Sequence, residues 1–162
     1  MIDKIYVDMD GVLSDFHKRY KEVFNVCPET VKSKQFHRQF DKFIVDMNFA
    51  TLELMPDTLK LLSALDSLEV PKEILSSTAS EARHDVVSKQ KRIWLKNHGI
   101  NYKQNFVPGK SLKYKFATPN SIIIDDTVSV IEDWNKAGGI GILHKNAETT
   151  IDKLKRLMLQ SL

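Results

Sequence analysis

The sequence contains a single cysteine, Cys27, among its 162 residues. One cysteine can form neither an internal disulfide nor a cysteine-ligated metal cluster, so both are excluded. No run of 18 apolar residues is present, which excludes a membrane-spanning helix. The first residues lack the apolar core of a signal peptide. We therefore expect a cytoplasmic protein that contacts no membrane.

A large excess of one charge is also absent. Lysine and arginine number 24 against 21 acidic residues, for a net charge of +3, so total charge does not indicate nucleic-acid binding. The basic residues are nevertheless unevenly spread: nine of them fall between Glu81 and Lys115, together with two acids. The simpler interpretation is a solvated helix face. The alternative is a positive flank that attracts phosphorylated substrates.

Apolar residues make up 42% of the chain and charged residues 28%, which is typical of a soluble globular protein. Short apolar runs predict strands at 4–8, 73–77, 105–107, 121–126 and 140–143. Apolar residues recur at helical spacing in 55–65, in 80–99, in 127–138 and in 148–160. This alternation of strands and helices predicts an α/β fold, in which a parallel sheet is covered by helices on both faces.

Segment 15–46 departs from this alternation, because it has two helical stretches and no strand between them. Pro28 interrupts the helical pattern near 25–30. We interpret 15–49 as an insertion that forms a small helical cap. Residues 1–14 together with 50–162 would then form the catalytic core.

Polar side chains gather where the predicted strands end. Asp8 and Asp10 follow the first strand, Ser76 and Ser77 end the second, and Asp125 and Asp126 end the strand at 121–126. Ligands of an open parallel sheet bind beyond the carboxyl ends of its strands. Acidic groups at two neighbouring strand ends would repel one another without a cation between them. Oxygen ligands of this kind favour Mg²⁺ over zinc.

A carboxylate can attack phosphorus and form an aspartyl phosphate if positive charge offsets the anionic phosphoryl group. A second carboxylate can protonate the leaving oxygen and later deprotonate water. The chain has the sequence DxDG at 8–11, then a strand-end serine, a lysine and a strand-end Asp-Asp pair. With these motifs in this order, between Ile5 and about Leu143, it resembles the haloacid dehalogenase-like (HAD) hydrolase superfamily.

The resemblance implies a HAD-like Rossmannoid sheet with a small C1-type helical cap. "VDMDGVLSDF", "LELMPDTLKLL" and the interval from Lys115 to Asp125 are most similar to the 5'(3')-deoxyribonucleotidase branch and its bacterial and phage relatives. The activity implied is Mg²⁺-dependent hydrolysis of phosphate monoesters through an aspartyl phosphate, with nucleotides as substrates. A polynucleotide end phosphatase and a phosphatase of another small metabolite are the alternatives.

The resemblance also implies a role for each matching residue. Asp8 would be the nucleophile and a metal ligand, and Asp10 the general acid and base, with its backbone carbonyl on the metal. Asp125 would bind the metal directly, and Asp126 directly or through water. The phosphate would be bound by Ser76, Lys115 and Met9. Ser77 replaces Ser76 if the strand ends one residue later, and Lys113 replaces Lys115 if the connecting loop is shorter.

Substrate choice would rest with the cap, whose aromatic residues could stack on a base. Phe16 and Phe49 are the candidates, because each lies where the insertion joins the core. Phe36, Phe40 and Phe43 recur at helical spacing, which is more typical of the interior of the cap.

Overall fold

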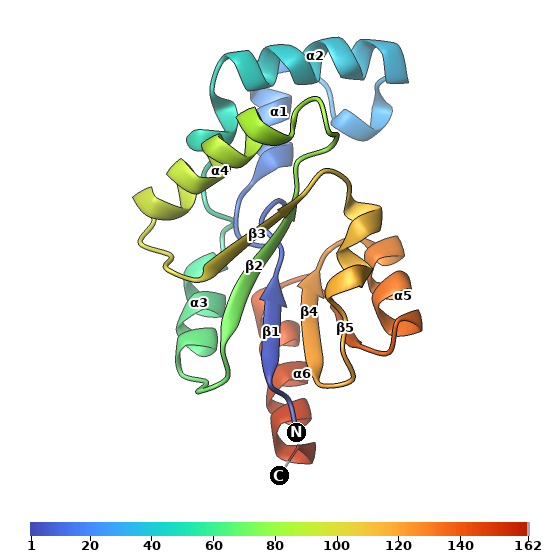
Figure 1. Cartoon of the computed structure of the whole chain (residues 1–162). Coiled ribbons are helices and arrows are strands. Elements are labelled where there is room, and N and C mark those ends of the chain that lie inside the picture. Colours follow the sequence, from blue (N-terminus) through green and yellow to red (C-terminus); the bar gives the residue numbers. More distant parts are fainter. Residues whose placement is uncertain (162) are drawn as a thin grey trace.

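The computed structural model describes residues 1–161 and is built around a five-stranded, fully parallel sheet (Figure 1). Its strands are β1 (Lys4–Val7), β2 (Lys72–Ser77), β3 (Lys103–Val107), β4 (Ser121–Asp125) and β5 (Ile140–Leu143). They lie in the order β3-β2-β1-β4-β5. The predicted α/β class is therefore confirmed.

Six α-helices accompany the sheet in the described part of the chain. They are α1 (Phe16–Phe24), α2 (Ser33–Val45), α3 (Thr58–Asp66), α4 (His84–Asn97), α5 (Val128–Lys136) and α6 (Ala147–Gln160). Three 3₁₀ helices, η1 (Pro28–Thr30), η2 (Asn48–Ala50) and η3 (Lys110–Phe116), complete the described structure. Within residues 1–161, no helix is both long and apolar enough to cross a membrane.

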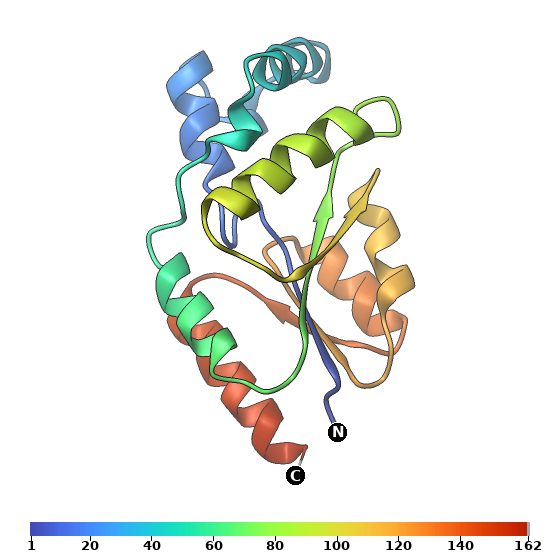
Figure 2. The ribbon, with the colours of Figure 1, turned by 60° about the vertical axis from the view of Figure 1, so that its left-hand side comes forward.

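Successive side chains of each strand enter two different cores, because side chains alternate across a sheet. In β1, Ile5 and Val7 join the large core formed with α3, α4 and α6. Tyr6, between them, packs into the smaller core with Trp134 of α5 and the aromatic ring of Phe116 in η3. Helices thus cover both faces of the sheet, as Figure 2 shows from a second side.

The inserted helices α1 and α2 lie beyond the carboxyl ends of the strands (Figure 1). Helix α2 and the chain that follows it are fastened to α4 by polar contacts between buried groups. The Gln90 side chain donates to the Ile44 carbonyl oxygen at 2.8 Å and accepts from the Phe49 N–H at 3.2 Å. Trp94 donates from Nε1 to the Leu52 carbonyl oxygen at 2.7 Å. The division into core and cap stays a prediction, and one continuous apolar cluster includes side chains from both.

Several element boundaries differ from the prediction by one or more residues. β3 is two residues longer than 105–107, and η3 was not predicted, because one short 3₁₀ helix gives no apolar periodicity to detect. Helix α4 begins at His84 instead of near residue 80. The chain turns first, with Ala79 in the left-handed region at φ 75°. The loop between β2 and α4 is therefore longer than the sequence suggests.

Candidate active site

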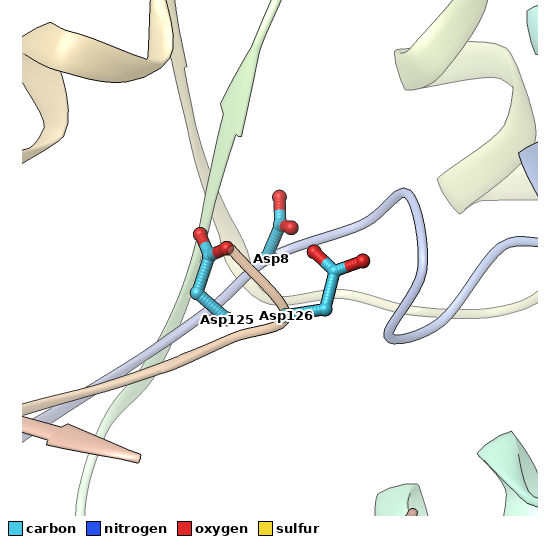
Figure 3. Close-up of side chains that lie close together, drawn as sticks. All are labelled: Asp8, Asp125 and Asp126. Carbon is cyan, nitrogen blue, oxygen red and sulfur yellow. The ribbon is translucent and has the colours of Figure 1, made fainter. Parts of the chain in front are cut away.

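Three carboxylates converge at the carboxyl ends of β1 and β4 (Figure 3). The parallel register pairs Val7 with Ile124, which places Asp8 and Asp125, one residue further along each strand, side by side. Asp126 follows, and one carboxylate oxygen from each of the three lies within 4.8 Å of the others. Asp8 and Asp125 are buried, whereas Asp126 is exposed. The predicted acidic cluster is thus present among the described residues.

Lys113 of η3 provides the positive charge beside this cluster. Its Nζ donates to Asp8 Oδ1 at 2.9 Å and to Asp125 Oδ2 at 2.7 Å, and the side chain is only 3% exposed. Lys115, the residue first assigned to this place, lies exposed on the surface. The geometry therefore favours Lys113, the alternative left open above, over Lys115. The physical reason is the turn of η3, which directs side chains two residues apart to different sides.

The electrostatics of the cluster show an excess of negative charge. Burial, followed by repulsion from Asp125, raises the pKa of the Asp8 carboxyl well above its ordinary value. The pKa of Asp126 is also raised, by the partial desolvation of its carboxyl group beside the other two and then by repulsion from Asp125. Burial opposes the charged form of Lys113, but Asp8 and Asp125 outweigh it and raise the pKa of the ammonium. Lys113 is therefore charged, and one lysine does not compensate for three carboxylates.

Gly11, the glycine of the DxDG sequence, is required by the approach of Asp126. A Cβ at Gly11 would lie 2.0 Å from Asp126 Oδ2 and 2.7 Å from its carboxyl carbon, far inside contact distance. The backbone at Gly11 also has φ +85°, which L side chains rarely adopt. The space left by the missing side chain therefore admits the third carboxylate.

Asp10 lies apart from the three converging carboxylates and has its own partners. Ser14 Oγ donates to Asp10 Oδ1 at 3.0 Å, and Lys91 Nζ donates to Asp10 Oδ2 at 2.9 Å. Its carboxylate is therefore not one of the three clustered carboxylates, and the role predicted for its backbone carbonyl stays a prediction. Lys91, on α4, was counted only as part of the basic flank. Nothing in its local sequence marked it, because α4 brings it to the site across the fold.

The two candidate serines lie on opposite faces of the sheet. Ser76 is fully buried, and its Oγ accepts a hydrogen bond from Lys91 at 2.7 Å. Ser77 shares the face of Leu75, in the small core, which is also the face from which Asp8 and Asp125 extend. Its half-buried side chain lines a pocket. The geometry therefore favours Ser77, the alternative left open above, as the serine that reaches a phosphate.

Met9 contributes through its backbone alone. Its side chain is 1% exposed and lies in the large core. Its carbonyl oxygen accepts from the N–H groups of Val12, Leu13 and Ser14 at 2.8–3.1 Å, which forms the tight turn of the DxDG loop. A contact between Met9 and a phosphate would therefore have to come from the backbone.

A small aromatic pocket of about 180 Å³ opens beside Asp10 and Ser77. Phe16 and Phe49 line it, and their rings are stacked, with centroids 5.7 Å apart and planes 6° from parallel. Phe36 and Phe40, expected in the interior of the cap, also line the pocket. Only the fully buried Phe43 behaves as interior alone. One face of α2 thus serves both purposes, which helical spacing cannot distinguish.

The basic flank between residues 81 and 115 does not form one solvated face. Lys91 and Lys113 are buried in the site. Arg83 Nε and Nη2 each lie 2.8 Å from Asp41 Oδ1, and the Arg92 guanidinium lies 5.1 Å from the ring centre of Phe106. Lys103 Nζ lies 3.8 Å from Glu73 Oε1, so five of the nine basic residues are engaged within the protein.

The donor set fits a divalent cation that prefers oxygen. Asp8, Asp125 and Asp126 offer three carboxylate oxygens in one small volume, and the missing side chain of Gly11 makes room for the third. Asp8, Asp10, Asp125 and Asp126, with Lys91 and Lys113, sum to −2 when all are ionised, which one divalent cation offsets. No sulfur or imidazole takes part in this cluster of described residues, so Mg²⁺ fits better than zinc.

The comparison with protein families decides the assignment. The model of the family described as "5' nucleotidase, deoxy (Pyrimidine), cytosolic type C protein" (NT5C) matches residues 1–156. The chain belongs to this family. The predicted membership of the HAD superfamily is thereby confirmed, as is the predicted class of enzyme, a phosphoric monoester hydrolase. No curated protein matches the chain significantly.

Solved structures show the same fold at low sequence identity. A hydrolase from Streptococcus pneumoniae is similar with a TM-score of 0.59 and 13% identity, over 95% of this chain and 98% of that one. A hydrolase from Pseudomonas syringae has a TM-score of 0.53 and 14% identity, over 87% and 82%. A HAD family enzyme from Bacteroides thetaiotaomicron, solved with magnesium and inorganic phosphate, has a TM-score of 0.50 and 13% identity, over 90% and 95%.

Proposed function

We propose that this NT5C family member is a Mg²⁺-dependent 5'(3')-nucleotidase that hydrolyses deoxyribonucleoside or ribonucleoside monophosphates. The observation that carries the proposal is that Asp8 contacts Lys113 and lies in the carboxylate cluster, while Asp10, two residues further along, lines the aromatic pocket. A carboxylate, positive charge and a site for a planar ring are what hydrolysis of a nucleotide requires. The family's printed description, a 5' nucleotidase, supports the same substrate class.

Asp8 serves as the nucleophile. An oxygen of its carboxylate attacks phosphorus, the ester P–O bond breaks, and an aspartyl phosphate forms. Lys113 contacts Asp8 directly, so its ammonium lies where negative charge builds up on the transferring group. Ser77, on the same face of the sheet, donates its hydroxyl hydrogen to a phosphoryl oxygen. Bound to Asp8, Asp125 and Asp126, Mg²⁺ would supply further charge compensation to the phosphoryl oxygens.

Asp10 serves as the general acid and then as the general base. Its carboxyl group passes a proton to the leaving oxygen as the ester bond breaks, which releases the nucleoside as a neutral alcohol. The resulting carboxylate then takes a proton from the water that hydrolyses the aspartyl phosphate. Asp10 lines the aromatic pocket, so it lies between the phosphate site and the place where the nucleoside would sit.

The pocket supports a small aromatic leaving group. Its volume of about 180 Å³ is below the range of roughly 300–1,000 Å³ that is usual for drug-sized ligands. Phe16, Phe36, Phe40 and Phe49 offer ring faces and edges on which a base packs by its apolar surface. A single pyrimidine ring suits such a pocket, in agreement with the word pyrimidine in the family description. In this scheme residues 15–49 act as the cap that selects the substrate.

Two alternatives are separated by their substrates. A polynucleotide end phosphatase would use the remaining exposed lysines of the basic flank, and its binding would weaken steeply with added salt. A phosphatase of another small metabolite would leave the aromatic pocket unused. The engagement of Arg83, Arg92, Lys91 and Lys113 within the protein weakens the first alternative.

Phosphate release from a substrate panel tests the proposal. The panel contains 5'- and 3'-deoxyribonucleotides, ribonucleotides, sugar phosphates and an oligonucleotide with a 3'-phosphate, each with Mg²⁺ and with EDTA. We expect turnover of mononucleotides that requires Mg²⁺ and is lost in Asp8→Asn. Preference for the oligonucleotide would support the end phosphatase, and preference for sugar phosphates would support the metabolite phosphatase. A folded protein that releases phosphate from none of them would contradict the proposed function.

A further inference from the structure

Lys91 carries a charged group that is buried, although packing of the fold at this position does not require a charge. The residue is 1% exposed, and its Nζ donates three hydrogen bonds: to Asp10 Oδ2 at 2.9 Å, to Ser76 Oγ at 2.7 Å and to the Ser77 carbonyl oxygen at 2.9 Å. An ammonium has three N–H donors, so all of them are used. Burial of an ammonium is costly, and an apolar side chain of similar length would fill the same space.

The attachment of α4 does not depend on this lysine. Gln90 already binds the backbone of the inserted segment at Ile44 and Phe49, and Trp94 binds the Leu52 carbonyl oxygen shortly after it. The Lys91 ammonium instead reaches the loop after β1 and the end of β2. It also lies 5.3 Å from the ring centre of Phe49, which lines the aromatic pocket. Lys91 thus contacts Asp10, the end of β2 and a ring of the aromatic pocket at the same time.

The contacts of Lys91 fix Asp10 relative to the phosphate site. Ser14 binds one oxygen of the Asp10 carboxylate and Lys91 binds the other, so rotation of the group is restricted from both sides. The same ammonium binds the carbonyl oxygen of Ser77, whose hydroxyl lies on the face of Asp8. The distance between Asp10 and the end of β2 is therefore set by one atom, Lys91 Nζ.

We propose that Lys91 is a positioning residue that holds the Asp10 carboxyl where it can protonate the oxygen of the leaving group. The inference rests on the proposed function, since it requires transfer of a phosphoryl group to Asp8. In that step the bond from Asp8 to phosphorus forms and the ester P–O bond breaks. The leaving oxygen keeps the electron pair of the broken bond and takes the proton of Asp10.

The dependence on the leaving group distinguishes this role from a structural one. A nucleoside 5'-alkoxide is a poor leaving group and needs the proton, whereas p-nitrophenolate leaves readily without it. Loss of the positioning residue should therefore slow the reaction of a nucleotide much more than that of p-nitrophenyl phosphate. General damage to the fold or to the phosphate site would slow both reactions alike.

The experiment compares kcat/KM of Lys91→Met for deoxyuridine 5'-monophosphate and for p-nitrophenyl phosphate, at saturating Mg²⁺. This ratio reports the first transfer to Asp8 whichever step limits kcat. We expect a loss of about 100-fold for the nucleotide and under about 10-fold for p-nitrophenyl phosphate, because a general acid contributes about 10²–10⁴. Lys89→Met, the same change at an exposed lysine of α4, is the matched control and should change neither value.

A second variant keeps the test decisive if Lys91→Met does not fold. Ser14→Ala removes the hydrogen bond to the other oxygen of Asp10 with little change in volume, and should give a smaller loss with the same preference for p-nitrophenyl phosphate. Equal losses for the two substrates in the folded variants would overturn the inference while leaving the nucleotidase intact. A wild-type protein that hydrolyses neither substrate would contradict the proposed function itself, and the inference with it.

Discussion

The site contains two buried lysines whose surroundings differ: one contacts Asp8 and the other contacts Asp10. Lys113 donates to two carboxylates, Asp8 and Asp125, and its pKa is raised despite burial. Lys91 donates to one carboxylate, that of Asp10, and to two neutral oxygens at the end of β2. The first lysine therefore balances charge around Asp8, the proposed nucleophile, whereas the second mainly fixes geometry.

The comparison shows that burial by itself does not define what a lysine does. Both side chains are at most 3% exposed, and both lie within hydrogen-bond distance of an aspartate proposed to take part in the reaction. Removal of Lys113 would leave two adjacent carboxylates without compensation. Removal of Lys91 would leave one carboxylate that is 30% exposed to water and still bound by Ser14. The cost of losing each lysine should differ accordingly.

The largest effect is expected for Lys113→Met. Breaking a buried ion pair by removing one partner costs about 3–5 kcal/mol of unfolding free energy in the metal-free protein. Loss of the charge beside the transferring group should also lower kcat by about 100- to 1,000-fold. Urea unfolding and phosphate release measure the two quantities.

Lys115→Met is the control for Lys113, because the same change is made two residues away on the surface. It should alter stability by less than about 0.5 kcal/mol and leave turnover unchanged. A greater loss of activity in Lys115→Met than in Lys113→Met would show that the sequence-based assignment had been correct and that the position of Lys113 is misleading.

An intermediate effect is expected for Gly11→Ala, which acts on the metal cluster and leaves both lysines intact. The added Cβ would lie 2.0 Å from Asp126 Oδ2, so the carboxylate must move away. We expect Mg²⁺ to bind about 10- to 100-fold more weakly, as for other changes that displace a ligand. Isothermal titration of the variant with Mg²⁺ measures this.

Gly99→Ala separates displacement of the ligand from backbone strain. Gly99 also has positive φ, at +66°, but nothing lies within 4 Å of the added Cβ. Both variants should lose about 1 kcal/mol of stability from the left-handed conformation. Only Gly11→Ala should lose affinity for Mg²⁺, and equal affinities in the two variants would show that Asp126 is not a ligand.

The smallest effect is expected for Asp126→Asn and depends on pH. The pKa of Asp126 is higher in the folded protein than its unfolded value of 3.8. The folded state therefore binds more protons, so this carboxyl lowers stability progressively as pH rises above 3.8. Without metal, Asp126→Asn should raise Tm at pH 7 by on the order of 2 °C, and the gain should disappear near pH 3.

Added Mg²⁺ should reverse the order of the two Tm values, so that wild type becomes the more stable protein at pH 7. In the proposed site three carboxylates of the wild-type protein bind the ion, so its Tm at pH 7 should rise more than that of Asp126→Asn. Thermal unfolding with and without MgCl₂ measures both parts. A metal-free Asp126→Asn protein that is less stable than wild type at pH 7 would contradict the view that the carboxylates repel one another.

Most of the fold could be predicted from the sequence, because its signals are local. The strand at 140–143 matches β5 in both bounds, and 121–126 differs from β4 by one residue. The strand-end aspartates could be predicted as a cluster, since parallel strands bring their carboxyl ends to one edge. The roles of the aromatic residues of α2 could not be predicted from their spacing, because one helix face contributes to both the cap interior and the pocket.

Local sequence signals could not predict which lysines and which serine lie in the site. Lys91 lies 81 positions along the chain from Asp10, and no local pattern connects the two. The choice of Lys113 over Lys115 depends on the 3₁₀ turn of η3, and that of Ser77 over Ser76 depends on which face of β2 each side chain enters. The two lysines are two residues apart and the two serines are adjacent, and sequence spacing does not show which member of each pair points into the site.

The sequence by itself determined the alternation of strands and helices, the order of the acidic motifs and hence the family. It could do so because hydrophobic periodicity and short turns depend on neighbouring residues alone. The tertiary structure decided which lysine contacts Asp8, which lysine contacts Asp10 and why position 11 must be glycine. These depend on where side chains end in space, and packing between elements far apart in the chain sets those positions.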